Sequence, residues 1–259
     1  MRVHKQFTRW HNKNKNFIRI VSLPLQKRYY IMTFYQSLVD GNNTTLAFLH
    51  RRDFQNAVVS SIATMTLCQE LRSILAVSSL TAVSWAPDCV DQCIMLLSNE
   101  GDSSSRVDDD VDNTNVFVFD QGIALPSSST TPGAASLEVV STILVFNSAL
   151  AHQLYAQEQH DTERFQTLLV RSKRLYELAL NSYSDVEHNV LFQFAVVNNL
   201  AVIELQTDHA VLSIEYFEDL LSTLMVLVDR GCSKSIWYYL RGFLKNYPFQ
   251  AASAPASAA

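Results

Sequence analysis

The amino-acid sequence predicts an all-α fold, built as a stack of antiparallel helical hairpins, and three observations support it. The 259 residues include only six glycines and six prolines, which is few for a turn-rich β protein. The run from Val139 to Gln157 contains no charged side chain, as expected of a helix that is buried on nearly all sides. A spacing of small residues also recurs along the chain, and it is typical of paired helices whose backbones approach closely.

The recurring spacing divides much of the chain into three units, each of which we interpret as a pair of antiparallel helices. The positions that define them are Ala149, Ser172, Tyr176 and Ala179 in one unit, Ala201, Ser213, Phe217 and Leu220 in a second, and Thr45, Ala57, Ser61 and Thr64 in a weaker third. We therefore expect Ala201 to lie against Ser213. Ala149 and Ser172 are 23 residues apart, where Ala201 and Ser213 are 12 apart, and this excess predicts a longer loop or an extra polar helical turn.

Parts of this pattern resemble the tetratricopeptide repeat, W-x2-L-G-x2-Y…A-x3-F…P. Leu200-Ala201 is similar to its L-G step, and Ser172-x3-Tyr176 and Ser213-x3-Phe217 are similar to its A-x3-F step. The chain departs from the pattern at other positions, where it has Val145, Val197, His152 and Glu204 and lacks the closing proline. The layout of residues 137–247 is also similar to repeat-like chains of unicellular eukaryotes, a similarity that implies a fold but no activity.

The resemblance to tetratricopeptide repeats implies a concave groove lined by the first helix of each pair. The positions that correspond to this groove are Asn43, Asn147, His152 and Asn199. An asparagine amide there can both donate to and accept from a peptide backbone. The alternative is that each asparagine satisfies a neighbouring helix or loop inside the stack. Neither Val139 to Gln157 nor Val190 to Gln206 contains a lysine or arginine, so a clamp for a terminal carboxylate is not predicted.

The helical domain is expected over residues 33–247, with irregular segments inside it and at both ends. Residues 1–32 are a basic head outside the fold, either a transit-like segment or an extension that precedes a true start at Met32. The internal segments are a disordered acidic loop at 98–114, a short β-strand or hairpin near 115–125 that bends at Gly122, and a Ser/Thr/Pro linker at 127–136. Residues 248–259 form a disordered tail, and the aromatic residues before it suggest a capping helix.

The charge distribution restricts the partners. Residues 1–31 contain eight of the 20 basic residues and no acidic residue, so the rest of the chain has 12 basic and 25 acidic residues, a net charge of -13. An acidic body argues against nucleic acid or an anionic membrane as the main partner. The polar residues inside the 139–157 run argue against a membrane span. Four cysteines without a secretory signal indicate a cytoplasmic protein, or an organelle-targeted one if the basic head is a transit peptide.

No chemical motif stands out, so we predict no catalytic residue, no metal and no cofactor. Cys89 and Cys93 lack the two further ligands that zinc needs. The Asp108–Asp112 run lacks the glycine and glutamate of a calcium loop. The expected function is non-catalytic protein–protein interaction, as a scaffold or adaptor that binds a peptide or helix in its groove, with the oligomeric state left open. The alternatives are an intracellular enzyme with a dispersed site and a purely architectural subunit of a larger complex.

Overall fold

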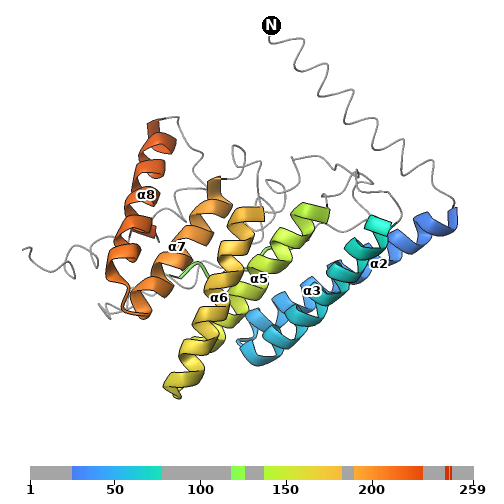
Figure 1. Ribbon diagram of the computed structural model, residues 1–259, viewed down its shortest axis with the longest axis horizontal. Coiled ribbons are helices and arrows are strands. Elements are labelled where there is room, and N and C mark those ends of the chain that lie inside the picture. The colour runs from blue at the N-terminus through green and yellow to red at the C-terminus, as the bar shows by residue number, and fades with distance from the viewer. Residues whose placement is uncertain are drawn as a thin grey trace, which may run out of the picture.

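The part of the chain that the structure describes is almost entirely helical, which confirms the all-α prediction. The computed structural model describes residues 25–77, 118–125, 137–182, 190–229, 243, 244 and 246. Its helices, labelled as in Figure 1, are α2 (Leu25–His50), α3 (Phe54–Val77), α5 (Leu137–Gln157), α6 (Thr162–Ser182), α7 (Val190–Gln206) and α8 (Ala210–Asp229). No strand occurs in these ranges.

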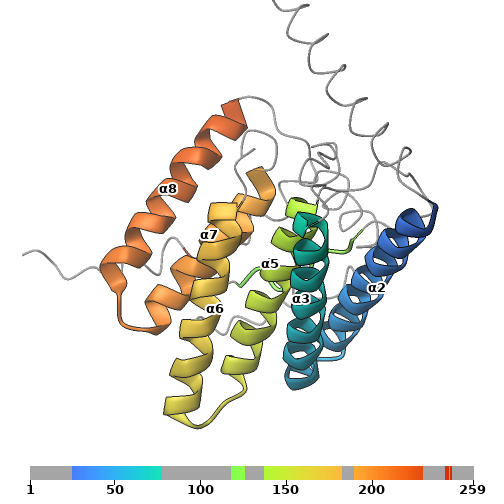
Figure 2. The ribbon, with the colours of Figure 1, turned by 45° about the vertical axis from the view of Figure 1, so that its right-hand side comes forward.

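The helices lie side by side in chain order, from α2 to α8 (Figure 2). Each helix packs against the next one in this order, and α2 also contacts α5. Short turns join α2 to α3, α5 to α6 and α7 to α8, so the chain forms three hairpins in a row. The first helices of these hairpins are α2, α5 and α7.

Local interactions set the turns of the hairpins. Arg52 and Asp208 adopt left-handed backbone angles, with φ of 58° and 62°, and so reverse the chain after α2 and α7. Asp53 caps α3 by accepting a hydrogen bond from the backbone N–H of Asn56 at 3.3 Å. Asp161 caps α6 through the N–H of Glu163 at 3.0 Å.

The small residues predicted to bring paired helices together do lie at those contacts. The Ser172 hydroxyl donates to the Ala149 carbonyl at 2.7 Å, between α6 and α5. The Ser213 hydroxyl donates to the Ala201 carbonyl at 2.8 Å, between α8 and α7. The long separation of Ala149 and Ser172 comes from extra helix at the ends of α5 and α6, because only four residues, 158–161, connect these helices.

The first hairpin uses a different close contact. A Cβ atom added to Gly41 would collide with the Thr64 hydroxyl, so glycine allows α2 to approach α3. Ser61, which the spacing pairs with α2, instead donates to the Ser148 hydroxyl at 3.0 Å and so joins α3 to α5.

Helix α5 is the central element. Sixteen of its 21 residues are buried, including Phe146, which packs edge-on against Tyr176 with ring centroids 5.7 Å apart. Among the described helices it is also the single one that is long and apolar enough to cross a membrane, and 83% of its most apolar window is buried inside the fold. Its apolar composition is therefore accounted for by neighbouring helices.

An ion pair between a partly exposed lysine and a buried glutamate joins α6 to α7. The Lys173 ammonium lies 2.6 Å from the Glu204 carboxylate, which is fully buried, and Nδ1 of His209 lies 3.0 Å from the other carboxylate oxygen. Hydrogen bonding to Glu204 raises the pKa of Lys173, so the ammonium keeps its charge.

Some expected boundaries differ from the structure or lie outside the described residues. Helix α2 begins at Leu25, inside the head that was expected to precede the fold, and Tyr30 contacts Phe34 with ring centroids 4.8 Å apart. The acidic loop, the Ser/Thr/Pro linker, the Cys89–Cys93 pair and the C-terminal tail all lie outside the described residues. Of the aromatic stripe near the C-terminus, Phe243 is described; it is buried and stacks on Phe194, with centroids 5.5 Å apart.

Candidate functional site

The candidate site is formed by residues 118–125 and the helices that hold them. These residues, the thin green segment of Figures 1 and 2, pass across α5 between α7 and α2. Each of the three first helices contributes one buried asparagine to the segment: Asn42 from α2, Asn147 from α5 and Asn199 from α7. We call the surface formed by these three side chains the asparagine face.

At one end of the segment, Asn199 binds both backbone groups of Phe119. Its Oδ1 accepts from the Phe119 N–H at 2.9 Å, and its Nδ2 donates to the Phe119 carbonyl at 3.0 Å. A side-chain amide has the same donor and acceptor groups as a peptide unit, so Asn199 takes the place of a neighbouring strand.

Asn147 binds Ile123 in the same way, four residues further along the segment. Its Oδ1 accepts from the Ile123 N–H at 2.8 Å, and its Nδ2 donates to the Ile123 carbonyl at 2.8 Å. Asn42 adds a third bond by donating to this carbonyl at 3.0 Å, and it also accepts from Asn147 at 2.7 Å. Both carbonyl lone pairs of Ile123 are thus engaged.

The expected strand or hairpin near residues 115–125 is not confirmed in the part of it that the structure describes. The part described, 118–125, has no strand, although its alternating apolar residues are typical of one. One side-chain amide can reach the N–H and the carbonyl of a single residue where the backbone is extended, since both groups then point to the same side. Phe119 and Ile123 are therefore extended, and their partners are asparagine side chains.

A second layer of polar groups lies behind Asn199. Its Nδ2 also donates to the Tyr176 hydroxyl at 2.9 Å, and that hydroxyl donates to Gln153 at 3.0 Å. Burial raises the pKa of Tyr176, so the hydroxyl stays protonated and remains a donor. Asn198 donates to the Asn199 Oδ1 at 3.1 Å and accepts from Asn246 at 2.8 Å. This network fixes the orientation of the Asn199 amide.

Apolar contacts give the site its shape. Phe119, Ile123 and Leu125 are at most 4% exposed, whereas Asp120 is exposed to solvent. The Phe119 ring packs between Phe146 and Phe243, each with its centroid at 6.3 Å.

Gly122 lies where the segment comes closest to α2. A Cβ atom at this position would collide with the Leu46 side chain and would lie 3.3 Å from the Asn147 Oδ1. Because α2 leaves so little room, this position of the segment favours glycine.

The structure brings together two of the four predicted groove residues. Asn147 and Asn199 both hold the segment, so each of them satisfies a loop inside the stack, which is the alternative to an open groove. Asn43 is exposed, and the α2 residue that bonds the segment is its buried neighbour Asn42.

His152 is not part of the asparagine face. Its Nδ1 lies 2.8 Å from the Ser148 carbonyl in its own helix, and since a carbonyl accepts only, Nδ1 carries the proton. Burial lowers the pKa of His152, which is therefore neutral. The side chain is 3% exposed, and it contributes to the packing of α5.

Other residues of the site were not identified from the sequence. Asn42, Asn198 and Asn246 are buried and polar, but nothing in their local sequence distinguishes them from exposed asparagines. The strand-like segment 118–125 was recognised without its partner. Two features of the sequence together indicate the pairing. Asparagines recur on the first helices, and the strand-like segment has no second strand to satisfy its backbone groups.

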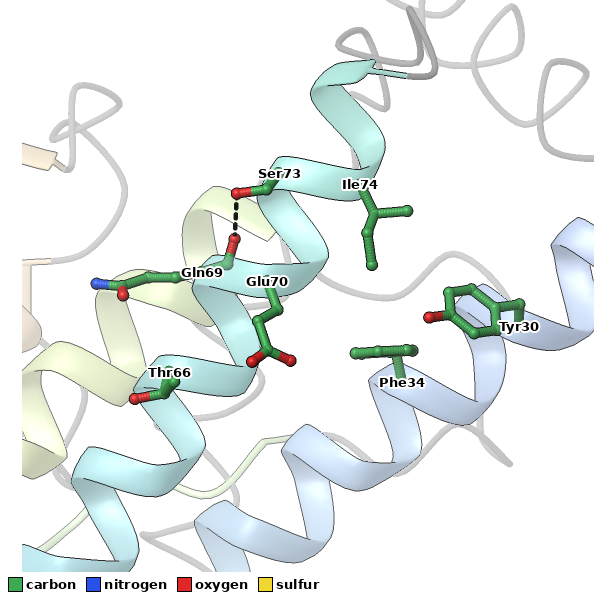
Figure 3. Close-up of a pocket in the computed structure, with 7 residues that line it drawn as sticks. All are labelled: Tyr30, Phe34, Thr66, Gln69, Glu70, Ser73 and Ile74. Atoms are coloured by element: carbon green, nitrogen blue, oxygen red, sulfur yellow. Dashed lines mark hydrogen bonds between the residues drawn. The ribbon is translucent and has the colours of Figure 1, made fainter.

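A separate cleft lies between the start of α2 and the end of α3 (Figure 3). It has a volume of about 450 Å3 and is lined by Tyr30, Phe34, Thr66, Gln69, Glu70, Ser73 and Ile74. The Ser73 hydroxyl bonds the Gln69 carbonyl at 3.0 Å, within its own helix. The cleft contains none of the predicted site residues.

Comparisons with protein-family models, with curated proteins and with solved structures found no match to this chain.

Proposed function

We propose that the chain is a non-catalytic protein-interaction scaffold of the tetratricopeptide-like kind, whose first helices form a groove for extended polypeptide. The observation that carries this proposal is that Asn147 and Asn199 each bind the N–H and the carbonyl of a single residue in an extended segment. Backbone hydrogen bonds of this type recognise an extended chain whatever its side chains are.

The surroundings of the asparagine face also favour a polypeptide ligand. Two of its amides lie four residues apart along the bound segment, and four residues of extended backbone cover roughly 13 Å. The apolar side chains between the amides accept Phe119 and Ile123, which gives selectivity in addition to the backbone contacts. Site chemistry of this kind binds and orients a chain, and it offers no nucleophile or general base to Phe119 or Ile123.

The experiment that tests this function is affinity purification from the native cell. Three forms of the chain are compared: the natural sequence, the double variant Asn147→Ala plus Asn199→Ala, and the control Asn43→Ala, which changes an exposed asparagine of α2. The expected result is a partner recovered with the natural chain and the control, and lost with the double variant. Circular dichroism checks that the double variant keeps its helices; equal recovery from a helical double variant contradicts the proposal.

A further inference from the structure

Residues 118–125 occupy the surface that the proposed function assigns to a partner. We propose, resting on that function, that this segment is an internal ligand that a partner displaces. The partner presents an extended segment of the same pattern, with Phe, Gly, Ile and Leu spaced as in Phe119, Gly122, Ile123 and Leu125.

Several contacts between helices are made without the segment. The hairpins are closed by the bonds of Ser172 to Ala149 and of Ser213 to Ala201, and Ser61 joins α3 to Ser148 of α5. None of these atoms belongs to residues 118–125. These contacts can therefore remain when the segment leaves, as displacement requires.

The asparagine face needs a ligand with backbone hydrogen-bonding groups, and apolar side chains alone cannot fill it. Buried amides without partners are costly, so an apolar side chain in this place would leave the Asn147 and Asn199 amides unsatisfied. Any extended peptide restores the same bonds, because it offers one N–H and one carbonyl at each position. Exchange of one such peptide for another thus conserves the hydrogen bonds of the face.

The contacts of the internal segment define the partner's sequence. The Phe119 position fills the space between Phe146 and Phe243. A side chain at the Gly122 position has to displace the end of the Leu46 side chain, so a bulky residue is disfavoured there.

Covalent linkage gives the internal segment an advantage. A tethered ligand acts at an effective concentration on the order of 1 mM when its linker is short and flexible. A partner must therefore bind the asparagine face more tightly than the tethered segment does in order to displace it from the natural chain, and cutting the tether makes displacement easier. The natural chain is accordingly a self-occupied form.

The test separates the segment from the helices after folding. Protease recognition sites are inserted into residues 98–114 and 127–136 of the full-length chain, one on each side of the segment, and both are cut. A fluorescent synthetic peptide with the sequence of residues 115–126, NVFVFDQGIALP, is then added, and its binding is followed by anisotropy. The cut chain is expected to exchange its fragment for the peptide, and the uncut chain to bind it at least about tenfold more weakly.

Matched peptides and variants check that binding uses the asparagine face. A peptide with Gly122→Val should bind at least about tenfold more weakly than the parent peptide, since each factor of ten is about 1.4 kcal/mol. Cut chains with Asn147→Ala plus Asn199→Ala should lose binding, and those with Asn43→Ala should keep it.

Several results would overturn the inference. A cut chain that holds its fragment for a day against excess peptide, or that loses its helices when the fragment leaves, makes the segment a permanent part of the core. Equal binding by cut and uncut chains means that the segment does not compete. If the chain forms a concentration-dependent dimer and Ile123→Asp abolishes it, the occupant of the face is a second copy of the chain rather than another protein.

Failure of this inference can be told from failure of the proposed function. A partner whose recovery depends on Asn147 and Asn199, but which the synthetic peptide does not displace, supports the function and overturns the internal-ligand inference. If the cut chain binds the peptide but partner recovery does not depend on Asn147 and Asn199, the internal-ligand inference is supported and the proposed function fails.

Discussion

The side chain of Asn199 and the backbone of Phe119 form a closed pair of hydrogen bonds, with N–H to Oδ1 at 2.9 Å and Nδ2 to carbonyl at 3.0 Å. In an antiparallel sheet, two residues exchange the same pair of bonds. Here one helix supplies the partner groups from a side chain. An all-α scaffold therefore holds an extended segment without a second strand, and the first predictions concern this pairing.

Removal of either asparagine amide should destabilise the fold. Asn147→Ala leaves the N–H of Ile123 without its Asn147 partner and Asn199→Ala does the same to Phe119, so each change should cost about 1–3 kcal/mol of unfolding free energy. Urea denaturation followed by circular dichroism measures the effect. Asn43→Ala, in the exposed position next to Asn42, should stay within about 0.5 kcal/mol of the natural chain. Equal effects at Asn43 and Asn147 would contradict this account of the site.

Gly122→Val should loosen the segment while the helices remain. A valine side chain collides with Leu46 of α2, and overpacking of this kind costs about 1–3 kcal/mol. Hydrogen exchange should show faster exchange at the amides of Phe119 and Ile123 than in the natural chain. Gly122→Ala should have a smaller effect, because the end of the Leu46 side chain can rotate away. Unchanged protection in the valine variant would be evidence that the segment does not approach α2.

Ser213→Leu should separate α8 from α7. Ser213 is fully buried and its hydroxyl touches the Ala201 backbone, so a leucine there forces the helices apart at a cost of about 1–3 kcal/mol or more. Ser73→Leu on the exposed face of α3 is the control and should have little effect. The midpoints of thermal unfolding compare the two. A well-tolerated leucine at 213 would mean that close approach is not needed at this interface.

Stability should fall as the pH drops below the ordinary histidine range, through His152. Burial lowers the pKa of His152 from its ordinary value of 6.5, so below that pH the unfolded chain binds a proton that the folded chain does not. The stabilising effect of the neutral imidazole is complete above pH 6.5 and is lost as the pH falls from there towards the lowered value. His152→Leu should therefore flatten the dependence of unfolding free energy on pH between 7.5 and 5. His50→Leu, at an exposed position, is the comparison, and identical slopes in the two variants would rule out this role of His152.

Lys173→Met should destabilise the contact between α6 and α7. It leaves the buried Glu204 carboxylate without its cation, with His209 as the remaining neighbour, and the expected cost is about 1–3 kcal/mol. Adding Glu204→Gln to this variant should recover part of the loss, because the buried charge is then absent. A double-mutant cycle from urea denaturation measures the coupling. Zero coupling would show that the two side chains do not interact in solution.

The sequence alone was sufficient for the all-α class and for the small-residue contacts within two of the hairpins. Ser172 and Ser213 were placed correctly because a small residue against a small residue is a local, periodic signal with a steric cause. Asn147 and Asn199 were chosen because they recur at the same place relative to Ala149 and Ala201. The same rule predicts Asn43, which is exposed, whereas its neighbour Asn42 is the buried residue that bonds the segment.

What fills the asparagine face was decided by the tertiary structure. The pattern of Val118 to Leu125 specifies an extended backbone, but it does not specify a partner, since a backbone N–H and carbonyl can form hydrogen bonds with any suitably placed amide. That partner comes from helices far along the chain: Asn199 is 80 residues from Phe119, and Asn42 is 81 residues from Ile123. Local sequence determines backbone shape through steric preference, whereas the choice between a strand and a side-chain amide depends on which groups the folded chain brings within hydrogen-bonding distance.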